Sequence, residues 1–343
     1  MANLSTLAQT LVKRFSRRRS EPLTSLHFTA DPAAHVFNDR LYIYCSHDIE
    51  QDIPADDFGS QFDMRDYLLL SMNEPKGPVI NHGPILDVRE IPWAISQLWA
   101  PDAAVKDGVY YLFFPAKDKE GIFRIGVARS ESPTGPFKAE PNPIAGIYSI
   151  DPAVFRDTNG DHYLYFGGIW GGQLQNWRDG RFQRSKSSAR EYLPQPWEPA
   201  ICPKVARLSD DLLRLADPPR DLLITDEFGQ PLSEGDNKRR FFEGSWMHYH
   251  RGRYYFSWST GDTNLICYAT GESPYGPFRY EGVLLEPVSG WTTHHSICEF
   301  RGKWYLFYHD CSLSEGISHL RCVKMTELFY DAGGRIQTIR PHS

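Results

Sequence analysis

The chain has 343 residues, 41% hydrophobic and 23% charged, which is the composition of a globular protein with one large domain or two ordinary ones. Its formal net charge of −6 argues against nucleic acid as the main partner. No apolar run approaches the roughly 18 residues that a membrane span needs. The aromatic share of 14% suits either a β-rich core or a surface that binds sugar rings.

The first 24 residues are expected to form a tail outside the main fold. The stretch MANLSTLAQTLVKRFSRRRS carries a basic cluster but lacks the apolar segment of a secretory signal. The six cysteines are scattered without a C-x-x-C pair, and most lie in or beside apolar runs, which is typical of a reducing compartment. We therefore expect a cytoplasmic protein.

Five segments share one pattern, in which a turn residue precedes a run of β-branched and aromatic residues. In chain order they are DRLYIYCSHD (39–48), DGVYYLFFPA (107–116), GDHYLYFGG (160–168), GRYYFSWST (252–260) and GKWYLFYHD (302–310). A short strand is expected ahead of each, in DPAAHVF (31–37), DAAVK (102–106), DPAVF (151–155), EGSWMHYH (243–250) and HSICEF (295–300). The repeated unit is a strand, a tight turn and an aromatic strand.

A second hairpin is predicted in two units, because SESPTGPF (130–137) and GESPYGPF (271–278) each follow a strand-like segment. Helical periodicity is poor, and only SDDLLRLADPP (209–219) is expected to form a turn or two of helix. The units are irregularly spaced, which propeller blades accommodate in their loops more easily than the short coils of a β-helix do. We therefore predict an all-β fold, a five-bladed β-propeller, over residues 25–343.

Four of the five predicted inner strands begin at an acidic residue: Asp31, Asp102, Asp151 and Glu243. In a propeller the first strand of each blade lines the central channel, so these residues are expected to meet at one mouth. A single Asp-Pro pair often only starts a strand, but the recurrence favours a common pocket. Carboxylates in such a pocket have their pKa values pushed apart, which provides a base and an acid. With aromatic surfaces, this pattern is typical of a glycoside hydrolase.

Metal binding is the competing interpretation, because hard cations also collect carboxylates. The segment TTHHS (292–296) brings two histidines to the corresponding place in the fifth unit. A metallohydrolase that uses His294 and His295 is the weakest alternative, since no further ligands stand at metal-site spacing. A propeller that binds sugar or calcium without catalysis is a further alternative.

Several segments resemble family 43 of the glycoside hydrolases: FTADPAAHVF, WAPDAAVKDGVYYLFF, SIDPAVFRDTNGDHYLYFGG, FFEGSWMHYHRGRYYFSWST, SPYGPF and HHSICEFRGKWYLFYHD. The resemblance extends from about Leu26 to the C-terminus. Others resemble the single-domain β-xylosidase branch of that family: SHDIEQDIP, FDMRDY, FPAKDKEGIFRIGVA and FGGIWGGQLQ. The resemblance implies a five-bladed propeller enzyme that acts on xylan and arabinan fragments with inversion.

The resemblance also implies roles for three of the carboxylates. Asp31 would be the general base that activates water, and Glu243 would be the general acid that protonates the leaving oxygen. Asp151 would tune the pKa of Glu243 and orient it. Inversion would place the base and acid carboxyl groups roughly 6.5 to 9.5 Å apart. Asp102 falls where the family has an acid with a supporting role, so it is left out of the catalytic set.

Further contacts are implied in the same way. His294 would contact a divalent cation in the central channel, with calcium as the candidate, and Arg321 would lie near the nonreducing-end sugar. Gly244 and Ser245 stand where the resemblance leads us to expect alanines. Four aromatic residues are candidates for sugar contacts, although core packing explains each at least as well: Trp99, Phe114, Trp170 and Trp246.

The sequence therefore predicts an inverting, exo-acting β-xylosidase that releases xylose from the nonreducing end of short β-1,4-xylo-oligosaccharides. An α-L-arabinofuranosidase, or an enzyme with both activities, is the alternative, because a few loop residues decide between the two sugars. Short imported oligosaccharides are the expected substrate, since polymeric xylan would not reach the cytoplasm. The sequence makes no prediction of the oligomeric state.

Overall fold

The computed structural model describes residues 20–341, so most of the predicted tail (1–24) lies outside the described residues. Within that tail, Leu23 already belongs to the fold, because its backbone N–H donates to the carbonyl oxygen of Val323. Helical structure in residues 20–341 is limited to four short 3₁₀ helices. None of them has the length and apolar character needed to cross a bilayer.

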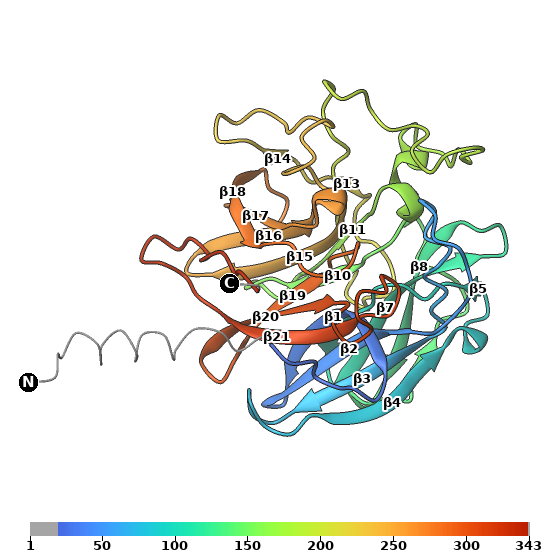
Figure 1. The fold of residues 1–343 in the computed structure, drawn as a ribbon, viewed down its shortest axis with the longest axis vertical. Helices are drawn as coiled ribbons and strands as arrows, with labels where there is room; N and C mark the ends of the chain where they lie inside the picture. The colour runs from blue at the N-terminus through green and yellow to red at the C-terminus, as the bar shows by residue number, and fades with distance from the viewer. Residues whose placement is uncertain (1–19, 342–343) are drawn as a thin grey trace, which may run out of the picture.

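The strands form five sheets that follow one another along the chain (Figure 1). The first sheet consists of β1 (Phe28–Phe37), β2 (Arg40–Asp48), β3 (Asp66–Met72) and β4 (Ile80–Asp87). The second consists of β5 (Ala94–Ser96), β6 (Asp102–Lys106), β7 (Val109–Asp118), β8 (Phe123–Ser130) and β9 (Lys138–Ala139). The third consists of β10 (Ala153–Arg156), β11 (His162–Phe166), β12 (Lys204–Arg207) and β13 (Arg220–Asp221).

The fourth sheet consists of β14 (Ile224–Thr225), β15 (Glu243–His250), β16 (Arg253–Ser259), β17 (Ile266–Gly271) and β18 (Phe278–Leu285). The fifth consists of β19 (His295–Phe300), β20 (Lys303–Asp310) and β21 (Cys322–Leu328). The 3₁₀ helices are η1 (Val88–Glu90), η2 (Trp170–Gly172), η3 (Leu174–Trp177) and η4 (Gly261–Thr263).

The five sheets are the blades of a propeller, as predicted. The inner strands contact one another in the order β1, β6, β10, β15 and β19, and β19 contacts β1 again, so the ring closes. The aromatic strands predicted from the repeated pattern are β2, β7, β11, β16 and β20. Inner-strand residues far apart in the sequence therefore surround one axis.

The hairpins between the first two strands of most blades owe their geometry to their turn residues. A two-residue type I′ turn requires positive φ at both positions, which Asn, Asp and Gly tolerate best. Four blades satisfy this requirement, with positive φ at Asn38–Asp39, Asp107–Gly108, Arg251–Gly252 and Arg301–Gly302.

The prediction of a helical turn in residues 209–219 was wrong. The segment forms a turn closed by an isolated bridge between Leu208 and Leu215. The Ser209 hydroxyl donates to the carbonyl oxygen of Arg214, and the Asp211 carboxylate accepts from the backbone N–H of Leu213. Such local bonds give the backbone an alternative to helix.

Candidate active site

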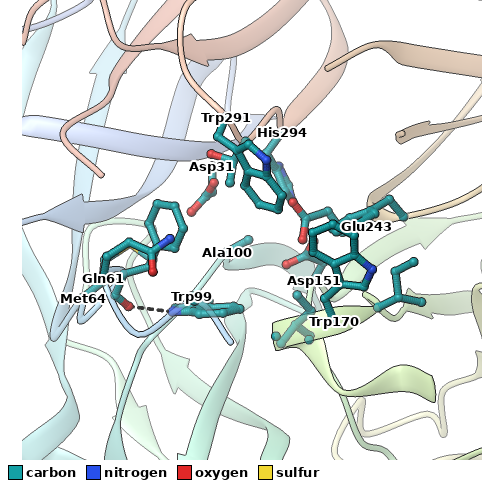
Figure 2. A pocket seen from close by; sticks show the side chains of 18 of the residues that line it. Asp31, Gln61, Met64, Trp99, Ala100, Asp151, Trp170, Glu243, Trp291 and His294 are labelled. Carbon is teal, nitrogen blue, oxygen red and sulfur yellow. Dashed lines mark hydrogen bonds and ion pairs between the residues drawn. The ribbon is translucent and has the colours of Figure 1, made fainter. Parts of the chain in front are cut away.

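A pocket opens at one end of the central channel, and all five blades contribute to its wall (Figure 2). In this view Asp31 lies on one side, and Asp151 and Glu243 lie together on the other. His294 and Trp291 approach from the fifth blade, and the indole of Trp99 forms part of the opposite wall. Three of the four acids predicted to converge therefore share one pocket, whereas Asp102 does not line it and the prediction was wrong for this residue.

The backbone is irregular where each of these acids enters the pocket. Asp31 and Asp151 have φ values of 50° and 55°, which residues with side chains adopt only rarely. The register of β1 shifts between Ala30 and Ala33, and that of β15 shifts just after Glu243. Bulges of this kind re-aim side chains next to active sites.

Gly244 follows the third acid with a φ of 70°. This left-handed conformation favours glycine and explains why glycine stands where an alanine was expected.

Asp102, by contrast, lies in a regular part of β6, opposite Phe113. One of its carboxylate oxygens lies 2.5 Å from Nε2 of His35 in β1, and the other accepts the backbone N–H of Val154 in β10 at 2.5 Å. Asp102 is buried and joins three blades. This contact set agrees with its exclusion from the catalytic residues.

Asp31 is surrounded by groups that favour its charged form. Burial alone would raise its pKa, but the nearby Arg321, His309 and His294 bring the pKa below the ordinary value. Nη1 of Arg321 donates to Oδ1 of Asp31 at 3.0 Å. The backbone N–H of Asp31 donates to Nδ1 of His309 at 3.1 Å, which fixes the unusual backbone conformation. Asp31 is therefore ionised at neutral pH.

The surroundings of Glu243, by contrast, favour its protonated form. Burial and the negative charge of Asp31 raise its pKa to about 8, although Arg321 lowers it in part. Burial and the charges of Glu243 and Asp31 also raise the pKa of Asp151 well above the ordinary value. At neutral pH the pocket thus holds an ionised carboxylate on one side and a protonated carboxyl group on the other.

Asp151 also anchors the backbone next to Glu243. Its Oδ2 accepts the N–H of Gly244 at 2.7 Å. This bond fixes the left-handed Gly244 that follows Glu243, which is the geometry that an orienting residue requires.

Two of the predicted sugar contacts line the pocket, namely Trp99 and Trp170. The indole N–H of Trp99 donates to the carbonyl oxygen of Phe62 at 2.7 Å. The guanidinium of Arg190 lies 3.9 Å from the centroid of the Trp170 ring, and the centroid of the Trp291 ring lies 5.8 Å from it.

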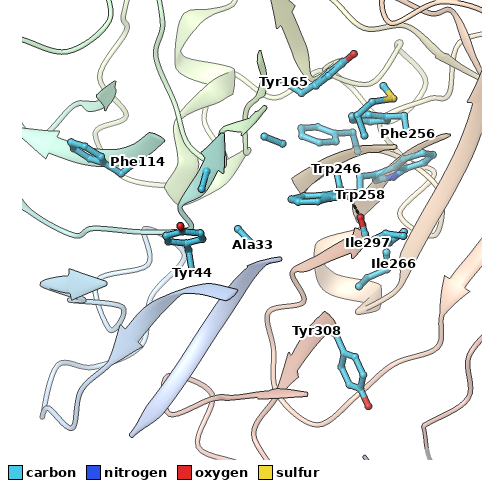
Figure 3. Packing of buried hydrophobic residues seen from close by; sticks show 14 of the residues in the cluster. Ala33, Tyr44, Phe114, Tyr165, Trp246, Phe256, Trp258, Ile266, Ile297 and Tyr308 are labelled. Carbon is cyan, nitrogen blue, oxygen red and sulfur yellow. Dashed lines mark hydrogen bonds between the residues drawn. The ribbon is translucent and has the colours of Figure 1, made fainter. Parts of the chain in front are cut away.

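The other two predicted sugar contacts, Phe114 and Trp246, were wrong, because both belong to the core (Figure 3). Phe114 is fully buried and stacks on Trp93 with ring centroids 5.9 Å apart. Trp246 is 6% exposed, and its indole N–H donates to the carbonyl oxygen of Ile297. Their side chains pack between blades and do not reach the pocket.

Sequence reasoning missed Phe62 and Trp291, which also line the pocket. Trp291 is 38% exposed, so its ring is accessible to a ligand. A signal for Trp291 was present, because it stands three residues ahead of His294 at the entrance to the inner strand of the fifth blade. Phe62 lies in the long connection between β2 and β3, where the repeated pattern gives no information.

The two adjacent histidines have different surroundings. His295 is fully buried, and its Nε2 lies 2.6 Å from the hydroxyl of Ser257. His294 lines the pocket with Nε2 at 3.8 Å from Oδ2 of Asp151. Nδ1 of His294, like that of His295, is buried without a hydrogen-bond partner, but only His294 lines the pocket.

A cation at this position would find few protein ligands. Between residues 20 and 341, no group of three His, Cys, Asp or Glu side chains is placed to hold a metal ion. One unpartnered imidazole nitrogen fits a cation whose other ligands are water molecules, and it does not fit the closed ligand set of a structural zinc site. The arrangement therefore does not support the metallohydrolase alternative.

Comparison with known proteins agrees with this geometry. The sequence profile of glycosyl hydrolases family 43 matches residues 22–335. The chain belongs to this family. It is a glycoside hydrolase of family 43, and its pocket holds three carboxylates, Asp31, Asp151 and Glu243.

Relatives of this family 43 enzyme are similar over nearly their whole length. It is 56% identical to a xylosidase/arabinosidase of Bacteroides ovatus over 91% of this chain and 95% of the relative. It is 55% identical to xylosidase/arabinosidase 43A of Humicola insolens, over 93% and 99%. A solved β-xylosidase/α-arabinofuranosidase from a compost microbial metagenome, in complex with xylotriose and in a calcium-free form, is 58% identical. Its TM-score is 0.92, with 96% of this chain and 99% of that chain covered.

The raised pKa of Glu243 predicts a pH-dependent cost to the stability of this family 43 enzyme. The pKa is about 8 in the folded protein and 4.5 for an ordinary glutamate, so the unfolded chain ionises first as the pH rises. Folding stability is therefore lost between these pH values, by at most about 1.4 kcal/mol for each pH unit. Glu243→Gln removes this loss, so the variant should gain stability relative to the parent from about pH 5 to 8. Urea denaturation across this range measures the difference, and a constant difference would contradict the raised pKa.

Proposed function

We propose that this protein is an inverting, exo-acting β-xylosidase that releases xylose from the nonreducing end of short β-1,4-xylo-oligosaccharides. The observation that carries the proposal is the pairing of an ionised Asp31 with a protonated Glu243 across one pocket. The names of the two relatives and the xylotriose in the similar solved structure support xylo-oligosaccharides as the substrate class.

The proposed reaction uses both carboxyl groups in one step. Asp31 takes a proton from a water molecule, whose oxygen attacks the anomeric carbon. Glu243 gives its proton to the leaving oxygen as the glycosidic bond breaks. Asp151 acts through the backbone of Gly244 to keep Glu243 in position. Proton exchange with solvent then restores the base and the acid.

Exo action is supported by contacts between the first and third blades, which close one wall of the pocket. Nε of Arg190, from the long insertion of the third blade, donates to Oδ2 of Asp57 in the first blade at 3.0 Å. The two segments also meet at Gly171, where an added Cβ would lie 2.7 Å from the carbonyl oxygen of Phe58. Because these segments meet at the wall, the site fits the end of a sugar chain better than its middle.

The second candidate is an enzyme that also acts as an α-L-arabinofuranosidase. The observation that favours it is the pair of activities in the names of both relatives and of the similar solved structure. The acid and base roles would be the same for either sugar.

We further propose that a divalent cation, with calcium as the first candidate, contacts Nδ1 of His294. The unpartnered, buried nitrogen supports this proposal, and the description of a similar solved structure as calcium-free is compatible with it. A bound cation would add positive charge beside the buried carboxylates of the pocket.

The acid and base roles predict different responses to the leaving group. Asp31→Asn should lower kcat by about 10² to 10⁴ on both xylobiose and 4-nitrophenyl β-D-xylopyranoside, because both reactions need activated water. Glu243→Gln should lower kcat much more on xylobiose than on 4-nitrophenyl β-D-xylopyranoside, because nitrophenolate leaves without needing a proton. The exposed Glu272 provides a matched control, and Glu272→Gln should retain the parent rates. Near-normal turnover of a folded Asp31→Asn or Glu243→Gln variant on xylobiose would contradict the assignment.

The substrate and calcium proposals are tested with one set of EDTA-treated samples. The parent should hydrolyse 4-nitrophenyl β-D-xylopyranoside faster than 4-nitrophenyl α-L-arabinofuranoside. Added calcium should raise its Tm, because a ligand that binds only the folded state stabilises that state. His294→Gln should lose the Tm increase. A preference for the arabinoside would reject the xylosidase proposal, and an equal Tm increase in both proteins would reject the cation contact.

A further inference from the structure

The guanidinium of Arg321 lies between two buried carboxylates. On one side its Nη1 donates to Oδ1 of Asp31 at 3.0 Å. On the other side its Nε and Nη2 donate to the two carboxylate oxygens of Asp48 at 2.8 and 2.7 Å. The Asp48 carboxylate also accepts the backbone N–H of Arg321 at 2.8 Å. Burial raises the pKa of Asp48, and the charge and hydrogen bonds of Arg321 oppose this rise, so one positive charge serves two carboxylates.

Asp48 stands behind the pocket. It is the last residue of β2, is 2% exposed and is not among the residues that line the pocket. Within residues 20–341, the hydrogen bonds of its carboxylate all go to Arg321, so it contacts the pocket through that residue and acts on Asp31 otherwise only by its charge. The two-pronged geometry of the pair fixes the plane of the guanidinium, so that a single nitrogen is directed at Asp31.

We propose that Asp48 is a positioning residue for the general base. It holds Arg321 in a fixed orientation and takes part of its charge, so that Asp31 is ionised but still basic enough to accept a proton from water. The proposal rests on the proposed role of Asp31 as the base.

The physical reason is the competition of two anions for one cation in a water-poor site, where charges are weakly screened. If Asp48 loses its charge, Asp31 becomes the only anion bonded to the guanidinium and no longer feels the repulsion of Asp48. Both changes stabilise the ionised form of Asp31 and make it a weaker base. A substitution at Asp48 leaves the other titratable groups that act on Asp31 in place, namely His309, His294, Asp151 and Glu243.

The repeated fold supplies a matched control. Asp310 ends β20 as Asp48 ends β2, and it is similarly buried. Its carboxylate accepts hydrogen bonds from Nζ of Lys324, at 2.7 Å, and from the hydroxyl of Ser312. Asp310→Asn therefore removes a buried charge at the same place in another blade, while Arg321 and its two carboxylates are unchanged.

The test is steady-state kinetics of the full chain on 4-nitrophenyl β-D-xylopyranoside and xylobiose. Asp48→Asn should lower kcat about three- to tenfold on both substrates, because a general base loses rate as its basicity falls. KM should stay within about twofold, since Asp48 does not line the pocket. Asp48→Glu, which keeps the charge, should recover most of the lost kcat, and Asp310→Asn should keep the parent kcat.

The proposal is overturned if Asp48→Asn folds and keeps the parent kcat, if the loss appears in KM alone, or if Asp310→Asn loses as much kcat as Asp48→Asn. If Asp48→Asn does not fold, Asp48→Ser is measured in the same way. Failure of both variants to fold would assign Asp48 to stability and also overturn the proposal. Failure of the base assignment is recognised separately, by an active Asp31→Asn.

Discussion

The single guanidinium of Arg321 faces more negative charge than it can neutralise. It pairs with Asp31 and Asp48, and its charge also acts on Asp151 and Glu243. Burial raises the pKa of Asp48, Asp151 and Glu243, whereas Arg321, His309 and His294 together bring the pKa of Asp31 below its ordinary value. The division of the pocket into an ionised side and a protonated side follows largely from the position of this cation, with His309 and His294 also favouring the ionised Asp31.

The propeller provides this arrangement by bringing inner strands together, but regular strands would not be sufficient. Asp102 occupies the regular position in its blade, and its carboxylate joins neighbouring blades. Asp31 and Asp151 have left-handed backbone conformations, and Glu243 precedes a glycine that has one. Backbone strain at Asp31 and Asp151, and the left-handed Gly244 beside Glu243, direct the three side chains into the pocket. The backbone N–H groups of Asp31 and Gly244 donate to His309 and Asp151 and hold these left-handed residues in place.

The sequence predicted those features that depend on local pattern. Turn residues and aromatic strands repeat in every unit, so the five blades and the positions of Asp31, Asp151 and Glu243 could be inferred. The direction of a side chain between blades has no such signal, which is why Phe114 and Trp246 were assigned to the pocket but lie in the core. The contact between Asp48 and Arg321 spans 273 residues, and no pattern in either segment indicates it.

The central claim is that Glu243 is protonated while Asp31 is ionised. The most direct measurement is a pH titration by NMR of protein labelled with ¹³C at the glutamate carboxyl carbon, with the Glu243 signal assigned by its loss in Glu243→Gln. The account predicts that this signal titrates near pH 8, far above the ordinary glutamate value of 4.5. A Glu243 signal that titrates together with the exposed glutamates would contradict the account.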